Sequence, residues 1–119
     1  MTSAKPMKVG IAGLGFGATE FIPTLETMPQ MEIVAGADQR PQALETFRQR
    51  YGGKTYESVD DMCADPDVEA VWVATPNHLH AANAISAANN GKHICLRKPM
   101  GVTMQECADV MDAVERNGV

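Results

Sequence analysis

The sequence predicts an α/β domain built on a doubly wound parallel sheet, with helices on both faces. Short runs rich in Val, Ile and Ala alternate along the whole chain with longer segments of helical periodicity. The apolar runs lack polar alternation, which is typical of strands that are covered on both faces. A glycine-rich turn over residues 13–18 follows the first apolar run and opens the first helix.

Five strands are expected, over residues 8–12, 32–37, 54–56, 70–74 and 93–96. Five helices fall between and after them, over residues 18–28, 41–51, 59–64, 78–89 and 104–117. Local signals set the limits of these helices. Pro41 fits the first turn of the second helix, Ser58 or Asp60 can cap the third, and Thr103 can cap the fifth. Gly52 and Gly53 end the second helix, and Gly91 ends the fourth. Gly118 and Val119 indicate a helix stop and the first residue of another strand, so we expect a sheet that breaks off before or at its sixth strand. An open strand edge would allow pairing with a second copy of the chain. Monomeric, concentration-independent sedimentation would count against such pairing.

The turn after the first strand has the spacing G-x-G-x-x-A, which is typical of a dinucleotide site. Its first glycine takes the tight turn, its second lets the backbone approach a pyrophosphate, and its alanine lets the helix pack close to the strand. Exposed amides at the helix start would hold the phosphates. The candidate cofactor-binding residues of this turn are Gly13, Gly15, Phe16, Gly17 and Ala18.

Asp38 follows Ala18 by 20 positions and lies at the end of the second predicted strand. A carboxylate there can accept hydrogen bonds from the ribose hydroxyls of a dinucleotide. Asp38 repels a 2′-phosphate and favours NAD, whereas Arg40, two residues on, attracts that phosphate if its side chain turns inward. NAD is therefore the expected cofactor, with NADP as the alternative.

A second group of polar residues follows the fourth and fifth strands, at the carboxyl edge where ligands of open sheets bind. We expect Thr75, Pro76, Asn77 and His80 to form a wall near the nicotinamide, with Asn77 as a helix cap; a capped helix start without a ligand is the other interpretation. Lys98 is a candidate proton donor and acceptor if burial and the neighbouring Arg97 favour its neutral form, and a solvated basic turn is the alternative. The bond before Pro99 is a candidate cis peptide.

Composition excludes several classes of protein. The 119 residues suffice for one domain, and a net charge of −5 argues against nucleic acid as a partner. No apolar run is long enough for a membrane span and no signal peptide is evident, so a cytoplasmic protein is expected. Three widely spaced cysteines, Cys63, Cys95 and Cys107, predict buried thiols rather than disulfides, and His78 with His80 lacks a third ligand for a metal.

Taken together, the glycine turn, Asp38, the run 75–80, Gly91-Lys92-His93 and Lys98-Pro99 resemble the amino-terminal half of the Gfo/Idh/MocA oxidoreductases, named after glucose-fructose oxidoreductase and inositol dehydrogenase. The finer resemblance is to phthalate dihydrodiol dehydrogenases. The resemblance implies a Rossmann domain over residues 1–119, with a carboxyl-terminal substrate domain absent from this chain. It also implies that Lys98 is the catalytic residue that relays a proton to the substrate oxygen.

This chain has Arg97 where the family usually has glutamate, and a guanidinium cannot accept hydrogen bonds from a ribose. Arg97 is instead a candidate contact of a cofactor phosphate. The expected function is cofactor binding for a dehydrogenase that acts on a secondary alcohol of a sugar, cyclitol or cis-dihydrodiol, without turnover by this chain alone. The alternative is a non-catalytic nucleotide-binding or self-assembling module, and the reading frame beyond residue 119 would distinguish the two.

Overall fold

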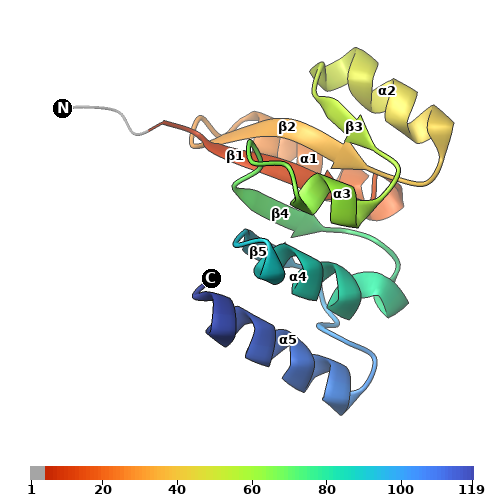
Figure 1. Cartoon of the computed structure of the whole chain (residues 1–119). Coiled ribbons are helices and arrows are strands. Elements are labelled where there is room, and N and C mark those ends of the chain that lie inside the picture. Colours follow the sequence, from red (N-terminus) through yellow and green to blue (C-terminus); the bar gives the residue numbers. More distant parts are fainter. Residues whose placement is uncertain (1–4) are drawn as a thin grey trace.

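Five parallel strands form one sheet with the order β3-β2-β1-β4-β5 in the computed structural model (Figure 1). The structure describes residues 5–119, and for residues 16 and 17 it describes the backbone only. The strands are β1 (Met7–Ala12), β2 (Met31–Ala37), β3 (Lys54–Tyr56), β4 (Ala70–Val73) and β5 (His93–Leu96). Each predicted strand is confirmed to within one residue at either end. The doubly wound α/β fold is therefore confirmed.

Five α-helices connect and follow these strands: α1 (Phe16–Glu26), α2 (Pro41–Tyr51), α3 (Val59–Cys63), α4 (His80–Asn89) and α5 (Met104–Asn117). The limits of α2 and α5 agree with the prediction. Helix α1 begins at Phe16, two residues before the predicted start, because the turn closes at Gly15, whose carbonyl accepts from the amide of Ala18.

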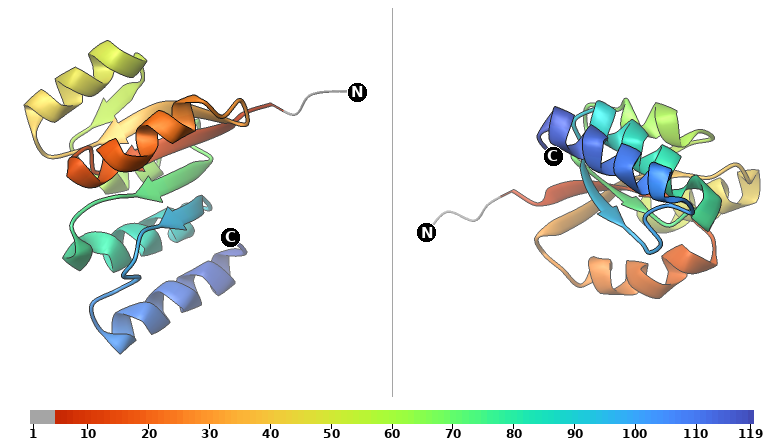
Figure 2. Two further views of the ribbon diagram at one scale, coloured as in Figure 1. Left: turned by 180° about the vertical axis from the view of Figure 1, so that it is seen from behind. Right: turned by 90° about the horizontal axis from the view of Figure 1, so that it is seen from below.

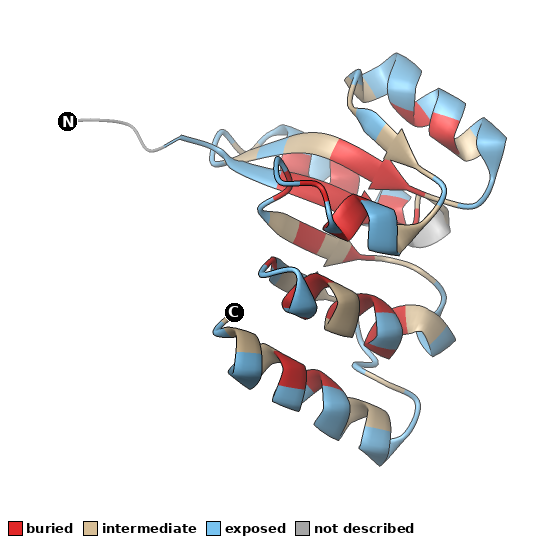
Figure 3. Ribbon diagram, viewed as in Figure 1, coloured by how far each residue is buried: buried red, intermediate tan, exposed pale blue. Residues whose placement is uncertain are grey.

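The helices form two layers around the sheet, with α1 on one face and α3, α4 and α5 on the other (Figure 2). Helix α2 packs beside α1, since the hydroxyl of Tyr51 donates to Glu26 at 2.8 Å. Burial is concentrated in the central strands and the inner helix faces (Figure 3). Alternate residues of β1 serve the two layers: Ile11 packs against α1, whereas Ala12 belongs to the core under α3 and α4.

Most of the predicted helix caps are confirmed. Thr103 and Glu106 form a capping box at the start of α5, and Ser58 accepts from the amide of Asp61 at the start of α3. The predicted cap by Asn77 is wrong, because a 3₁₀ turn, η1 (Asn77–Leu79), precedes α4 and no side chain caps either. The amide of Leu79 instead donates to the carbonyl of residue 76 at 2.9 Å, which closes a tighter turn.

The three cysteines differ in their exposure. Cys63 is buried, Cys107 is half-buried and Cys95 is exposed, and all three are free thiols. The expectation of a buried thiol is therefore wrong for Cys95. The residues on either side of it, Ile94 and Leu96, pack toward α4 and α5, so the alternation of the strand turns Cys95 to the opposite face.

A buried carboxylate joins β3 to the segment after α3. The side chain of Asp65 is 3 % exposed and accepts from the hydroxyl of Tyr56 at 2.5 Å, from the amide of Asp67 at 2.8 Å and from Lys54 Nζ at 3.2 Å. The hydrogen bond from Tyr56, followed by that from the amide, holds the pKa of Asp65 below its ordinary value. Asp65 is thus a charged group whose partners replace the water that it loses on folding.

The chain order places a crevice at the carboxyl ends of the central strands. From β1 the chain winds outward through β2 to β3, and it then returns to the other side of β1 to form β4 and β5. Ligands of open α/β sheets bind at this point of reversal, because the loops after β1 and β4 run in opposite directions. In residues 5–119, none of the helices is both long enough and apolar enough to cross a membrane.

Candidate functional site

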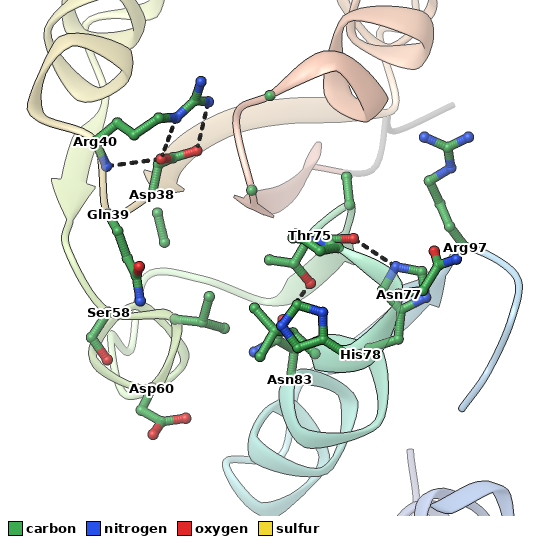
Figure 4. A pocket seen from close by; sticks show the side chains of 18 of the residues that line it. Asp38, Gln39, Arg40, Ser58, Asp60, Thr75, Asn77, His78, Asn83 and Arg97 are labelled. Atoms are coloured by element: carbon green, nitrogen blue, oxygen red, sulfur yellow. Dashed lines mark hydrogen bonds and ion pairs between the residues drawn. The ribbon is translucent and has the colours of Figure 1, made fainter. Parts of the chain in front are cut away.

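A pocket of about 900 Å³ lies at the carboxyl ends of the five strands (Figure 4). Gly13 follows β1, Asp38 follows β2 and Arg97 follows β5, while Thr75 lies two residues after β4. Its size falls within the range of small-molecule and cofactor sites. The two groups of polar residues that the sequence predicts therefore line one cavity.

The glycine turn forms the part of the pocket nearest β1. Gly13 has a φ of +90°, and a Cβ atom there would lie 2.8 Å from the amide nitrogen of Thr75. At Gly15 a Cβ would approach one described atom within 4 Å, Arg40 Nη2 at 3.4 Å, so this side of the turn is open to a ligand. Ala18 is buried against Val9 and Ile11 of β1, which confirms the predicted close packing of helix and strand.

The start of α1 offers backbone donors to an anion. No side chain caps the helix, and its first turn holds no acidic residue. The first amides of a helix lack partners within the helix, and the helix dipole favours negative charge there. Phe16 and Gly17, which are predicted cofactor contacts, belong to α1 by their backbone but otherwise lie outside the described residues.

Asp38 is held in a fixed position at the end of β2. Its carboxylate accepts from the amide of Leu14 at 2.9 Å, and from the backbone amide, Nε and Nη2 of Arg40 at 2.9, 3.0 and 3.1 Å. Burial raises the pKa of Asp38, but the hydrogen bonds from Arg40 and Leu14 outweigh it, so the pKa lies below its ordinary value. The carboxylate is thus ionised and aimed at the glycine turn. Arg40 has 62 % of its side chain exposed, and its Nη2 reaches toward the same turn, 3.4 Å from where a Cβ of Gly15 would stand.

The loop after β4 is tied to the rest of the pocket by buried polar groups. Thr75 Oγ1 donates to Asn83 Oδ1 at 2.5 Å. The ring of His80 is 2 % exposed, with Nε2 2.7 Å from the carbonyl oxygen of Thr75 and Nδ1 2.7 Å from that of Pro99. His80 therefore connects the loops after β4 and β5, and both of its ring nitrogens are taken up within the protein. Pro76 and Asn77 are exposed on the pocket wall.

The loop after β5 brings two basic side chains to the far end of the pocket from Asp38. Arg97 Nη2 lies 3.2 Å from Oε2 of Glu20 on α1. Lys98 lines the same end and is exposed, so this domain does not bury Lys98, which was the predicted condition for favouring its neutral form. The bond between Lys98 and Pro99 is cis, as predicted.

Sequence reasoning missed several pocket residues. Glu20, Gln39, Glu57 and Asn83 line the cavity, yet none of them belongs to a spaced motif. Gln39 directly follows Asp38, and this position is a sequence signal that could have identified it as a pocket residue. Glu20 contacts Arg97, which lies 77 positions away in the sequence, so no local pattern points to it. No group of three or more His, Cys, Asp or Glu side chains in the described part of the chain is placed to hold a metal ion.

Residues 7–119 match the sequence profile of the Gfo/Idh/MocA oxidoreductase family, which describes an NAD-binding Rossmann fold. The chain belongs to this family. It is 33 % identical over 113 residues to the 1-carboxy-3-chloro-3,4-dihydroxycyclohexa-1,5-diene dehydrogenase of Comamonas testosteroni, and this match covers 94 % of the chain and 28 % of that enzyme.

Two solved structures of the family share the fold. Scyllo-inositol dehydrogenase from Lactobacillus casei, solved with NAD(H) and scyllo-inositol, is 26 % identical with a TM-score of 0.89, covering 96 % of this chain and 34 % of that one. A 3-ketoreductase from Actinomadura kijaniata, solved with NADP and TDP-benzene, is 30 % identical with a TM-score of 0.88, covering 96 % and 35 %. The chain spans about a third of the length of these relatives. The resemblance stated from the sequence is confirmed, and the chain is an NAD(P)-binding oxidoreductase domain.

Proposed function

We propose that this domain binds NAD for a dehydrogenase that oxidises a secondary alcohol on a sugar, cyclitol or cis-dihydrodiol, and that the 119 residues alone bind the cofactor without turnover. The observation that carries the proposal is the ionised carboxylate of Asp38, fixed beside the uncapped start of α1. A carboxylate beside a helix start that no side chain caps suits the ribose and the diphosphate of a nucleotide.

The diphosphate is assigned to the turn from Gly13 to Ala18. Gly15 supports this assignment, because a ligand can approach the backbone where a side chain would otherwise stand. Asp38 is assigned to the ribose of the adenosine half, where its carboxylate accepts from the two hydroxyls. A 2′-phosphate would meet the same carboxylate and be repelled, which favours NAD over NADP. Arg40 keeps Asp38 in place, and its Nη2 donates to the Asp38 carboxylate at 3.1 Å.

The far end of the pocket is assigned to the nicotinamide. Thr75, Pro76 and Asn77 form the wall there, and His80 acts as a positioning residue that holds this wall against the loop of Lys98. The nicotinamide, when bound, supplies hydride transfer. Lys98 lines this end of the pocket and is assigned to the proton of the substrate hydroxyl.

Calorimetric titration of the chain with NAD and with NADP tests the proposal. NAD is expected to bind more tightly. Asp38→Asn is expected to weaken NAD binding about tenfold, since a hydrogen bond to a charged group contributes about 1.5–3 kcal/mol, and to narrow the preference over NADP. Asp109→Asn is the control, because Asp109 is an exposed residue of α5 that accepts from Gln105 outside the pocket.

Tighter binding of NADP would contradict the assignment of Asp38. Equal affinities of the wild type and Asp38→Asn for NAD would contradict it as well. Should neither dinucleotide bind to the folded chain, the assignment of the pocket itself would be wrong.

A further inference from the structure

The ionisable side chains of the pocket are unevenly distributed between its two ends. The end near β2 and β3 is lined by three carboxylates, those of Asp38, Glu57 and Asp60, and by one guanidinium, that of Arg40. The end near β5 holds two cations and one carboxylate, from Arg97, Lys98 and Glu20. The chain as a whole carries a net charge of −5, so this excess of positive charge is local. An anionic group entering the pocket is therefore favoured at the end near β5.

The contact between Arg97 and Glu20 is easily exchanged. One hydrogen bond of 3.2 Å joins the side chains, which are 39 % and 55 % exposed. Exposed pairs of this kind contribute only about 0–1 kcal/mol to stability. A guanidinium offers five donors in a planar fork that matches a carboxylate or a phosphate, and this contact uses one of them. A ligand anion can therefore replace Glu20 at little cost.

The position of the pair separates it from the proposed diphosphate site. Helix α1 begins at Phe16, and Glu20 lies four residues later, or about 6 Å along the helix axis at 1.5 Å per residue. Lys98, the residue assigned to the substrate hydroxyl, follows Arg97 directly in the chain. Lys98 is exposed, and none of the ion pairs in the described part of the chain involves it. The anion that Arg97 is placed to hold thus lies on the side of the reacting group.

We propose that Arg97, with the added charge of Lys98, forms an anion subsite for the substrate, and that Glu20 fills this subsite in the free protein. The substrate then carries a carboxylate or a phosphate ester, which displaces Glu20 and receives the guanidinium fork. This inference rests on the proposed function and narrows it from secondary alcohols in general to acidic ones.

Nuclear magnetic resonance of the chain saturated with NAD tests the subsite, with the Arg97 Nε–H and the Lys98 amide as reporters. The probes are benzoate, methyl phosphate and benzamide, the last being a neutral analogue of benzoate. Both anions are expected to shift the two signals saturably, and benzamide to bind about tenfold more weakly, because charge-assisted hydrogen bonds are about twice as strong as neutral ones. The tighter of the two anions identifies the chemical source.

Variants of the pair give effects of opposite sign. Arg97→Gln is expected to weaken benzoate binding about fivefold to tenfold, and Glu20→Gln to strengthen it about threefold, because the second change removes a competing anion. Arg116→Gln is the control, since Arg116 pairs with Asp112 in an exposed contact on α5 outside the pocket. That variant is expected to bind benzoate as the wild type does.

Several results would overturn the proposal. Benzamide could bind as tightly as benzoate, or both variants of the pair could leave benzoate binding unchanged. Saturation of the Arg97 signal by ADP alone would assign the guanidinium to the cofactor diphosphate instead. Failure of the anions to bind in the presence of bound NAD refutes the subsite alone, whereas failure of NAD to bind, measured first by calorimetry, refutes the proposed function.

Discussion

Replacing Gly13 by alanine should damage this domain more than the same change at another glycine of positive φ. Two costs add at this position. An L-residue in a left-handed conformation costs about 1–2 kcal/mol, and Gly13 has a φ of +90°. The new Cβ would also lie 2.8 Å from the amide nitrogen of Thr75 and 2.9 Å from the carbonyl carbon of Ala74. Both are backbone atoms, so the overpacking adds about 1–3 kcal/mol.

Gly52 carries the first cost, that of the left-handed backbone, without the second. It has a φ of +67°, and a Cβ atom there would meet no described atom within 4 Å. Gly52→Ala is therefore expected to lose about 1–2 kcal/mol, and Gly13→Ala about 2–5 kcal/mol. In urea unfolding followed by circular dichroism, the midpoint of the Gly13 variant should lie about 0.5–1.5 M below that of the Gly52 variant, for a slope near 2 kcal/mol per M.

Cofactor binding gives a second measure of the same change. Relief of the clash moves the amide of Thr75 and the turn itself, so Gly13→Ala is expected to weaken NAD binding, whereas Gly52→Ala leaves it unchanged. Equal urea midpoints for the two variants would refute the steric part of the reasoning. A Gly13 variant that keeps the NAD affinity of the wild type would show that the turn tolerates the shift.

Three further changes test the packing of the domain. Asp65→Asn should lower the free energy of unfolding by about 1–3 kcal/mol. The pKa of Asp65 in the folded protein is lowered from 3.8, so the stability that its carboxylate contributes is complete above that pH and is lost as the pH falls below it. The free energy of unfolding of the wild type should therefore fall more steeply in acid than that of the variant. Thr103→Ala should lower the free energy of unfolding by about 1 kcal/mol. Thr103→Ser should lower it much less, since serine retains the capping box with Glu106. Equal losses of stability in the two variants would argue against the cap. Phe21→Ala should lower the free energy of unfolding by about 2 kcal/mol. The ring of Phe21 stacks on that of Trp72, the single tryptophan, with 4.3 Å between the ring centroids, so the variant should also change the tryptophan fluorescence. An unchanged emission spectrum would contradict that contact.

The parts of the fold that local chemistry determines could be predicted from the sequence. The strands follow the apolar runs, and β2, β3 and β5 each end directly before a charged residue that lines the pocket. Helix α2 has its limits fixed by Pro41 and Gly52, and α5 by Thr103 and Gly118, so the prediction was accurate to the residue. The first residue of α1 and the turn before α4 were not predicted correctly, because backbone hydrogen bonds to residues 15 and 76 decide them.

The candidate site was predictable to the extent that its residues directly follow strands. Parallel strands bring their carboxyl ends to one edge, so Gly13, Asp38 and Lys98 share a pocket whatever their distance in sequence. Side-chain pairing across elements was not predictable. The contact of Arg97 with Glu20 and the burial of His80 depend on how α1 and α4 pack on the sheet, and no local pattern encodes either.

The imidazole of His80 makes the loops after β4 and β5 mechanically dependent on each other. It joins the carbonyl groups of Thr75 and Pro99, which lie beyond the point where the pairing of β4 with β5 ends. A displacement of the segment at Thr75 is thereby transmitted through a rigid ring to the segment that carries Lys98. The wall that lines the ligand and the amine beside it therefore arrive as one preassembled unit, and any adjustment on binding moves them together.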